Sequence, residues 1–348
     1  MNQPTNGWTP AHIASIKLVR IRDAVRFPDE ALKSVVFLGR HVGGKFAQAG
    51  TGFLVRHRDA IYIVTADHVA KSIGDTFAIR LNGPDGNSIE FFTRPSPMKW
   101  WRHPTDSTVD AAVCPWHLSP QRGDYNALPS ERFLTADNLA RTMIGIGDET
   151  VTLGLFRAVA GKSKMTPIAR SGHIAMMVDE RIPTKNYGDA ELYLVEAMTT
   201  AGLSGSPIYA RETITIPMHA ENRNESQWMF GLGGFYLLGL VHGFMPIKTA
   251  EEIAGADPKQ SWHSGICMVV PSQKILEILD QPGLLNYEDE IVKNARKPDN
   301  GETPVESGIV EPHQTTRAPE RKDRIGIPIP TRKQFEDDLA KAIRKRKD

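Results

Sequence analysis

Gly202-Leu-Ser-Gly-Ser-Pro207 lies between two apolar runs, residues 192–195 and 208–209. Its glycines and proline favour a tight turn with few side chains, which exposes the hydroxyl of Ser204. In such a turn the neighbouring backbone N–H groups can point at one spot, which is the geometry that an oxyanion hole requires. A Gly-Ser-rich surface loop has a similar composition, so the turn indicates a catalytic site only if other segments supply its partners.

Two upstream segments carry side chains that would activate a serine. A serine hydroxyl becomes a good nucleophile when a histidine removes its proton and a carboxylate holds that histidine. An apolar run ends in Thr65-Ala-Asp-His68, which places His68 at the start of a helical turn. Asp110 comes directly before the apolar residues 111–114, where a carboxylate entering a buried strand needs a hydrogen-bonding partner. Asp106 is the alternative acid, and the apolar run directly after Asp110 favours Asp110.

The three segments together resemble the trypsin-like, chymotrypsin-fold serine peptidases. Thr65-Ala-Asp-His68 resembles the histidine motif of that family, Asp110-Ala-Ala-Val113 the aspartate motif, and residues 202–207 the nucleophile motif. Residues 237–243 and 265–272 are similar to later strands of the bacterial HtrA-like branch. The three motifs occur in the order that the family requires, and such a combination is far more specific than any one of them.

The resemblance implies a Ser-His-Asp triad that cleaves peptide bonds through an acyl-enzyme intermediate. Ser204 would be the nucleophile, His68 the general base and then the general acid, and Asp110 the residue that orients the imidazole. The backbone N–H groups of Gly202 and Ser204 would form the oxyanion hole, and Gly202 would need a backbone conformation that a side chain hinders. No cofactor and no metal is expected, and the partner is a protein or peptide substrate.

The resemblance also implies substrate-binding positions. Met198 falls where the family's primary specificity pocket has its base, which predicts an apolar pocket that prefers medium-sized apolar side chains. His242, Gly243 and Phe244 align with the strand that pairs with the substrate backbone. For His242, a hydrogen bond to Asp110 is the preferred interpretation, and a residue that merely lines the cleft is the alternative.

Three positions depart from the family pattern. Leu203 stands where trypsins carry an aspartate that pairs with a newly cut N-terminus, so activation by that route is not expected. Ser206 replaces the more usual glycine. Asp67 precedes the histidine where alanine is common, and its carboxylate either lies beside the imidazole or points to solvent.

Short apolar runs separated by turn residues predict an all-β fold of two antiparallel, six-stranded-type barrels with a closing C-terminal helix. The site would then lie in the cleft between the barrels. The predicted organisation begins with an N-terminal extension, residues 1–32. A peptidase domain follows at residues 33–280, with its first barrel at about 33–116 and its second barrel at about 149–270. A charged tail, residues 281–348, comes last.

The tail is rich in charge, with 27 charged residues out of 68. This composition predicts a mostly disordered segment. The exception is a short terminal helix, because Thr331 and Gln334 have capping-box spacing and apolar residues follow on one face. Its basic end is interpreted as a solvated helix, and docking on a regulatory partner is the alternative.

Composition narrows the class of function. The formal net charge is +1, so nothing global points to nucleic acid or to a membrane surface. Cys114 and Cys267 both fall in apolar runs, which favours buried free thiols over a disulfide framework. We find neither a signal peptide nor a membrane-spanning apolar stretch, so a cytoplasmic location is the expectation.

Other chemistries lack their signatures. The sequence contains neither a metal-binding HExxH pair nor a GxxxxGK[ST] phosphate loop, and the α/β-hydrolase motif would need glycine at Ser206 and a histidine after the serine. Two alternatives to an active peptidase stay open. One is a protease-fold scaffold that holds peptides without cutting them, and the other is an effector whose tail or N-terminus engages a regulator.

Overall fold

The computed structural model describes residues 27–93, 99–116, 121–156, 159, 161, 163–200, 202–218, 227–247, 262–286 and 309–310. These residues all belong to the first of two units into which contacts divide the chain, residues 1–312. Most of the predicted N-terminal extension, 1–32, lies outside the described residues. So does nearly all of the tail, 281–348, with its terminal helix. The domain boundaries therefore stay predictions.

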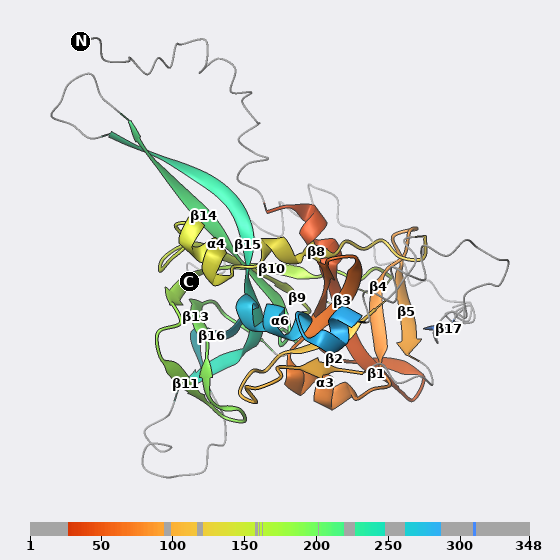
Figure 1. The fold of residues 1–348 in the computed structure, drawn as a ribbon. Helices are drawn as coiled ribbons and strands as arrows, with labels where there is room; N and C mark the ends of the chain where they lie inside the picture. Colours follow the sequence, from red (N-terminus) through yellow and green to blue (C-terminus); the bar gives the residue numbers. More distant parts are fainter. Residues whose placement is uncertain are drawn as a thin grey trace, which may run out of the picture. The chain divides into compact units, whose positions relative to one another are not determined.

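Strands dominate the described chain and form two main sheets, which confirms the all-β prediction (Figure 1). The apolar runs of the sequence coincide with strands that are buried along most of their length, such as β3 (Ala60–Thr65) and β9 (Glu149–Gly154). β-branched and aromatic residues fit this environment because their side chains pack on a pleated, buried surface.

The second half forms a closed antiparallel barrel of six strands in the order β10-β13-β16-β15-β14-β9. Closure pairs each of these six strands with two neighbours along part of its length. A separate hairpin, β11 (Arg181–Thr184) with β12 (Gly188–Glu191), lies between β10 and β13 in the chain. The remaining barrel strands are β10 (Ile168–Met176), β13 (Tyr193–Glu196), β14 (Pro207–Met218), β15 (Gln227–Ile247) and β16 (Trp262–Pro271).

The first half forms a nine-stranded sheet in the order β17-β5-β4-β1-β2-β3-β7-β6, with β8 paired to β2. Within the described part of the chain this order ends at β17 and β6 instead of closing. Two of its short strands, β8 (Leu128–Pro129) and β17 (Ile309–Val310), come from outside the range expected for the first barrel. The others are β1 (Val35–Val42), β2 (Lys45–His57), β4 (Ala78–Asn82), β5 (Ser88–Thr93), β6 (Trp101–Arg102) and β7 (Ala112–Pro115).

One stretch of the predicted disordered tail is thus a strand, because Ile309 and Val310 pair with Phe92 and Thr93 of β5. A two-residue apolar stretch within a polar, proline-rich segment carries no periodic signal. The pairing of these two residues with β5 is therefore visible only in the structure.

The two sheets share a hydrophobic core. One cluster of buried residues contains both Val64 of β3 and Leu240 of β15, so the first sheet and the barrel pack against each other. A second cluster, which includes Val195 and Ile208, fills the barrel. Cys114 and Cys267 are both buried and free, as predicted, and burial raises the pKa of both thiols.

Helix α6 spans Ser272–Leu279, the range predicted for the closing helix. It packs against β7 of the first sheet and against β15 and β16 of the barrel. His103 Nε2 lies 2.6 Å from Glu277 Oε2, which ties the helix to the first sheet. The other short helices are η1 (Asp29–Ser34), α3 (Asp67–Ile73), η2 (Ser130–Arg132) and α4 (Ala136–Arg141). Within the described residues, every helix falls short of the length and apolar character that crossing a membrane requires.

The pairing of β15 with β16 predicts a difference between two glycines of one strand. A Cβ at Gly239 would overlap the carbonyl oxygen of Val270, whereas a Cβ at Gly243 would meet nothing within 4 Å. We expect Gly239→Ala to lower the free energy of unfolding by about 1–3 kcal/mol, because the strands must separate. Gly243→Ala is the control and should change it by less than about 0.5 kcal/mol. Urea denaturation measures both, and equal stabilities would contradict this packing.

Candidate active site

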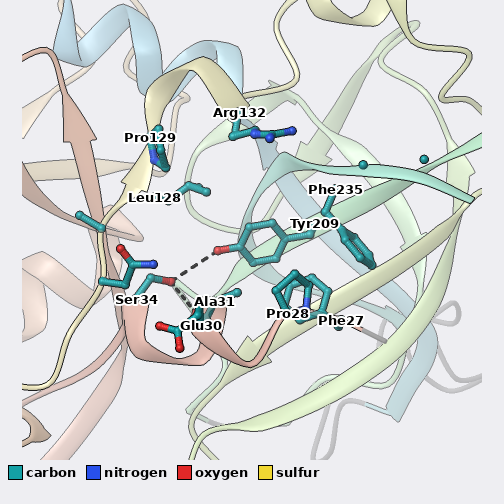
Figure 2. Close-up of a pocket in the computed structure, with 14 residues that line it drawn as sticks. Phe27, Pro28, Glu30, Ala31, Ser34, Leu128, Pro129, Arg132, Tyr209 and Phe235 are labelled. Atoms are coloured by element: carbon teal, nitrogen blue, oxygen red, sulfur yellow. Dashed lines mark hydrogen bonds between the residues drawn. The ribbon is translucent and has the colours of Figure 1, made fainter. Parts of the chain in front are cut away.

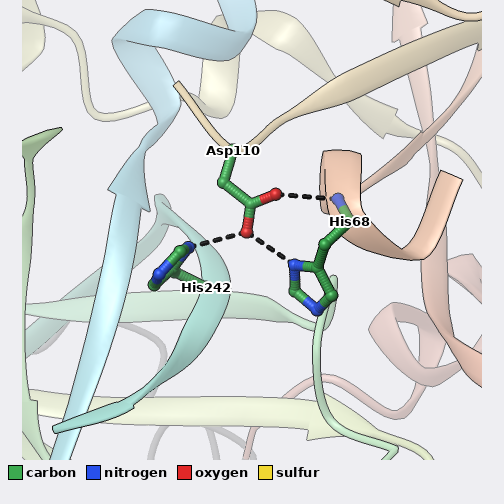
Figure 3. A group of neighbouring side chains, drawn as sticks. All are labelled: His68, Asp110 and His242. Atoms are coloured by element: carbon green, nitrogen blue, oxygen red, sulfur yellow. Dashed lines mark hydrogen bonds and ion pairs between the residues drawn. The ribbon is translucent and has the colours of Figure 1, made fainter. Parts of the chain in front are cut away.

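Asp110 is the acceptor at the centre of the candidate site (Figure 3). Its side chain is 1% exposed. One oxygen, Oδ1, accepts a 2.9 Å hydrogen bond from the backbone N–H of His68. The other, Oδ2, accepts bonds from His68 Nδ1 at 2.7 Å and from His242 Nδ1 at 2.6 Å. Both oxygens of a buried carboxylate are therefore satisfied, as its burial requires.

The electrostatics of Asp110 follow from these contacts. Burial by itself would raise the pKa of Asp110, but the hydrogen bonds and charges of His242 and His68 outweigh it and hold the pKa well below the usual range. The carboxylate is therefore ionised at neutral pH. An ionised carboxylate only accepts hydrogen bonds, so the Nδ1 atoms of both imidazoles carry the protons.

Sheet pairing brings these residues together. His68 is the second residue of α3, which begins directly after β3, and Asp110 comes just before β7. Because β3 and β7 pair antiparallel, with Thr65 opposite Ala112, the end of one strand lies beside the start of the other. His242 comes from β15, so the barrel supplies the third member of the cluster.

The imidazole of His68 is placed to exchange a proton. Its Nδ1 is taken by Asp110, and Nε2 lies on the opposite side of the ring (Figure 3). The side chain is 38% exposed, so a substrate can reach it. A histidine held at one nitrogen and accessible at the other has the geometry of a general base.

The Ser204 turn lies between the start of α3 and the strand that carries His242. Thr51 N–H donates to the carbonyl oxygen of Ser204 at 3.1 Å, and Gly205 N–H donates to that of Val241 at 2.9 Å. Gly205 has φ +82°, and a Cβ there would overlap the hydroxyl of Thr65. A glycine is therefore required, because only it allows the turn to approach the residues just before His68.

The backbone N–H groups of this turn differ in whether the described residues supply them with an acceptor. The N–H groups of Leu203, Gly205 and Ser206 donate to backbone carbonyls. Within the described residues, no acceptor is recorded for the N–H of Gly202 or of Ser204, which are the two donors predicted for the oxyanion hole. Gly202 has φ +104° and its carbonyl oxygen accepts from Thr51 Oγ1 at 2.7 Å, so the predicted special conformation is present and held in place.

One contact of a working triad is not made in this structure. Among the described residues there is no hydrogen bond between Ser204 Oγ and His68. Nucleophile–base contacts are often long in proteins without substrate and tighten when substrate binds. The structure thus joins His68 to Asp110 and packs Gly205, the residue after Ser204, against Thr65 and Ala66, just before His68.

Asp106, the alternative acid, faces elsewhere. It bonds to Thr108 and to Arg181 Nη2, the latter at 2.8 Å. Burial opposes ionisation of this side chain, but the hydrogen bonds of Thr108 and Arg181 outweigh it and lower the pKa of Asp106 to about 2. Geometry therefore assigns the contact with His68 to Asp110 rather than to Asp106.

The predicted substrate-binding residues are divided between two roles. Met198 is 56% exposed and Phe244 is 36% exposed, so both present apolar surface, and Gly243 has open space where a side chain would be. His242 instead forms a hydrogen bond with Asp110, as preferred from the sequence, rather than merely lining the cleft.

The sequence did not predict a set of contacts beside the cluster. Asp67 is buried, and its carboxylate accepts from Arg102 Nε at 2.6 Å, Lys71 Nζ at 2.7 Å and Tyr187 OH at 3.2 Å. Its side chain therefore points inward rather than to solvent. Tyr187 comes from the β11–β12 hairpin, and its ring lies edge-on to His242 with centroids 5.7 Å apart.

Tyr187 closes a chain of contacts around the cluster. Burial and the carboxylates of Asp110 and Asp67 raise the pKa of Tyr187, so its phenol stays protonated and can donate. The contacts run from His68 to Asp110, to His242, to Tyr187 and back to Asp67, the residue before His68. Of these contacts, only the ion pair between Asp67 and Lys71 has a spacing that predicts it, because residues four apart lie on one face of a helix. The hydrogen bond from Tyr187 to Asp67 joins residues 120 positions apart, and no spacing in the sequence predicts it.

His68, Asp110 and His242 are also a group of side chains of metal-ligand type, with candidate ligand atoms within 4.8 Å of one another. Two ligands at about 2.0–2.1 Å from a tetrahedral zinc lie about 3.3 Å apart. The separations of 2.6 and 2.7 Å seen here are hydrogen-bond lengths, so the cluster would have to spread to hold an ion. Hydrogen bonding accounts for the arrangement as it stands.

Comparison with known proteins finds structural neighbours. No family model and no curated protein matches the chain. Among solved structures, the MamO protease domain from Magnetospirillum magneticum aligns with a TM-score of 0.45 and 13% identity, covering 73% of this chain and 99% of that one. The HtrA-type protease AlgW, in a structure with a tripeptide, has a TM-score of 0.43 and 17% identity, covering 73% of this chain and 62% of that one. Deg5 has a TM-score of 0.36 and 17% identity, covering 51% of this chain and 75% of that one.

One of these neighbours, AlgW, is an HtrA-type protease. Because all three TM-scores are below 0.5 and all three identities are below 25%, the likeness supports no conclusion about the activity of this chain.

The lowered pKa of Asp110 predicts an acid-sensitive contribution to stability. A carboxylate with a depressed pKa stabilises the fold above about pH 4, its unfolded value, and this contribution is lost progressively as the pH falls further. We expect Asp110→Asn to be less stable than the wild type by about 1–3 kcal/mol at pH 7, with the gap narrowing as the pH falls below about 4. Urea denaturation at each pH measures it. Asp189→Asn, at an exposed position, should show no such gap, and a pH-independent gap for Asp110→Asn would contradict the assignment.

Proposed function

We propose that this chain is a serine endopeptidase that cleaves peptide bonds through a Ser204-His68-Asp110 triad and an acyl-enzyme intermediate. The observation that supports it most is the 2.7 Å bond from His68 Nδ1 to the buried carboxylate of Asp110. It fixes the tautomer of an accessible imidazole and leaves Nε2 as the free base. The contact of Gly205 with Thr65 and Ala66 also supports the proposal, because it holds the turn that carries Ser204 against the residues just before His68.

In the proposed reaction, His68 Nε2 takes the proton of Ser204 Oγ while the oxygen attacks the carbonyl carbon of the scissile bond. Asp110 stabilises the imidazolium that forms without taking its proton. The imidazolium then gives the proton to the leaving amine, the C–N bond breaks, and an ester to Ser204 remains. Water, activated by the same histidine, hydrolyses the ester and restores the free hydroxyl.

The free N–H groups of Gly202 and Ser204 would bind the oxyanion that develops in each step. Donors that are fixed before reaction stabilise this charge without reorganising, which is the largest single contribution in many acyl-transfer enzymes. The Thr51 bond to the Gly202 carbonyl and the Val241 bond to Gly205 N–H both support this arrangement, because they hold the turn on either side.

The proposed substrate is a protein or peptide with an apolar side chain before the scissile bond. Exposed Met198 and Phe244 support this preference, since they offer apolar surface near the turn and the β15 strand. The proposal is tested by cleavage of a peptide library. Clear selection for lysine or arginine at that position would contradict it.

A second candidate function is a protease-fold scaffold that binds peptides without cutting them. The observation that favours it is the lack of a recorded hydrogen bond between Ser204 Oγ and His68 in the described part of the chain. If the serine stays out of reach when a peptide binds, the cleft holds the peptide and no acyl transfer follows.

A fluorophosphonate probe separates the two candidates, because it reacts only with an activated serine. We expect the wild type to be labelled, and labelling to be lost in Ser204→Ala and in His68→Ala. Ser206→Ala is the matched control. Its buried hydroxyl has no recorded hydrogen-bond partner, so its loss should be tolerated and labelling kept. A folded wild type that stays unlabelled would favour the scaffold.

The two acids near the site give a further test. Asp110→Asn should lower kcat on a cleaved peptide by about 10³- to 10⁴-fold, the effect seen when the triad carboxylate of such enzymes is neutralised. Asp106→Asn should leave kcat within about threefold, because Asp106 contacts Thr108 and Arg181 rather than the imidazole. Equal losses in the two variants would contradict the assignment of Asp110.

A further inference from the structure

One pocket has a volume of about 430 Å³, and Figure 2 shows the side chains that line it. It is bordered by residues 27–34 with η1, the connection 126–132, β14 and β15. None of its lining residues belongs to the cluster around Asp110 or to the Ser204 turn. Its volume falls within the range of about 300–1,000 Å³ that small-molecule sites occupy.

The walls of this pocket are largely apolar and aromatic. Phe27 packs edge-on against Phe235 with ring centroids 4.5 Å apart, and it lies 5.2 Å from the ring of Tyr209. Leu128 and Pro129 form the facing side (Figure 2). An apolar group placed here would exchange water contacts for contacts with rings and aliphatic side chains.

Two buried hydroxyl groups lie within the pocket. Ser34 is 2% exposed and Tyr209 is 3% exposed, and their oxygens are 3.5 Å apart, at the long limit of a hydrogen bond. Ser34 donates its own proton to the carbonyl oxygen of Ala31. Burial raises the pKa of Tyr209 to about 12, so its phenol remains a neutral donor.

Arg132 supplies a positive charge at the rim. The side chain of Arg132 is exposed, and its guanidinium lies 6.0 Å from the centre of the Tyr236 ring. Among the described residues, no carboxylate lies within ion-pair distance of this guanidinium. Arg132 Nη1 lies 3.4 Å from the position that a Cβ of Gly234 would occupy, so the guanidinium is next to Gly234, which also lines the pocket. The other charged lining residue, Glu30, already pairs with Lys33 at 3.6 Å.

From this arrangement we infer that the pocket binds a small amphipathic carboxylate, with its carboxylate on Arg132 and its apolar body between Phe27, Leu128 and Phe235. A guanidinium matches a carboxylate with two parallel N–H···O bonds. A single cation, without a recorded carboxylate partner in the described part of the chain and with Glu30 also lining the pocket, suits a singly charged head better than a doubly charged phosphate. The inference makes no use of the proposed peptidase activity.

Calorimetric titration of the full chain with decanoate, below its micelle concentration, tests the inference, with decanol as the uncharged probe of equal length. We expect decanoate to bind more tightly than decanol. Arg132→Gln should weaken decanoate binding about tenfold or more and leave decanol binding unchanged, since it removes a charge-assisted contact. Phe235→Ala should weaken the binding of both, because it removes part of the apolar wall.

Arg141→Gln is the matched control, because Arg141 is also exposed and at the end of a short helix but lies outside the pocket. It should bind decanoate as the wild type does. Three results would each overturn the inference: no binding of decanoate to the wild type, unchanged decanoate binding to Arg132→Gln, or an equal loss in Arg141→Gln.

Discussion

The arrangement of the candidate site depends on one buried carboxylate. Asp110 accepts three hydrogen bonds, two from His68 and one from His242, and these residues come from both halves of the unit. Burying a charge costs several kcal/mol, and only close partners offset that cost. The same contacts that keep Asp110 ionised therefore hold β15 of the barrel against the end of β3 and the start of β7. These bonds thus link the candidate site to the contact between the two sheets.

A second constraint is the lack of side chains in the turn around Ser204. Gly205 fits against Thr65 only because it has no Cβ, and Gly202 adopts a φ that other residues rarely reach. These two glycines shape the turn that carries Ser204, and Gly205 packs it against Thr65 and Ala66, just before His68. The serine's environment is thus set by backbone conformation, while that of the histidine is set by side-chain contacts.

Much of this could be predicted from the sequence, because it depends on local patterns. The apolar runs coincide with strands, the range of α6 was correct, and the residues His68 and Asp110 of two predicted motifs form a hydrogen bond. The bond between His242 and Asp110 was also foreseen. The roles of these residues in catalysis remain predictions, since geometry alone does not show a reaction.

What the sequence did not reveal depends on contacts between distant segments. Tyr187 reaches Asp67 across 120 positions, and Arg102 reaches the same carboxylate from β6. Neither pair has a spacing that marks it, because tyrosine and arginine are ordinary residues in a loop and at a strand end. The pairing of residues 309–310 with β5 and the pocket beneath Arg132 have the same origin, since both are assembled by the tertiary fold.

The most direct test of the central role of Asp110 is proton NMR of the chain with ¹⁵N-labelled histidine. If one carboxylate orders both imidazoles, His68 and His242 should each show a slowly exchanging, strongly downfield Nδ1–H proton, and both signals should be lost in Asp110→Asn. Signals that survive this substitution, or an Nδ1 without a proton in either histidine, would contradict the account.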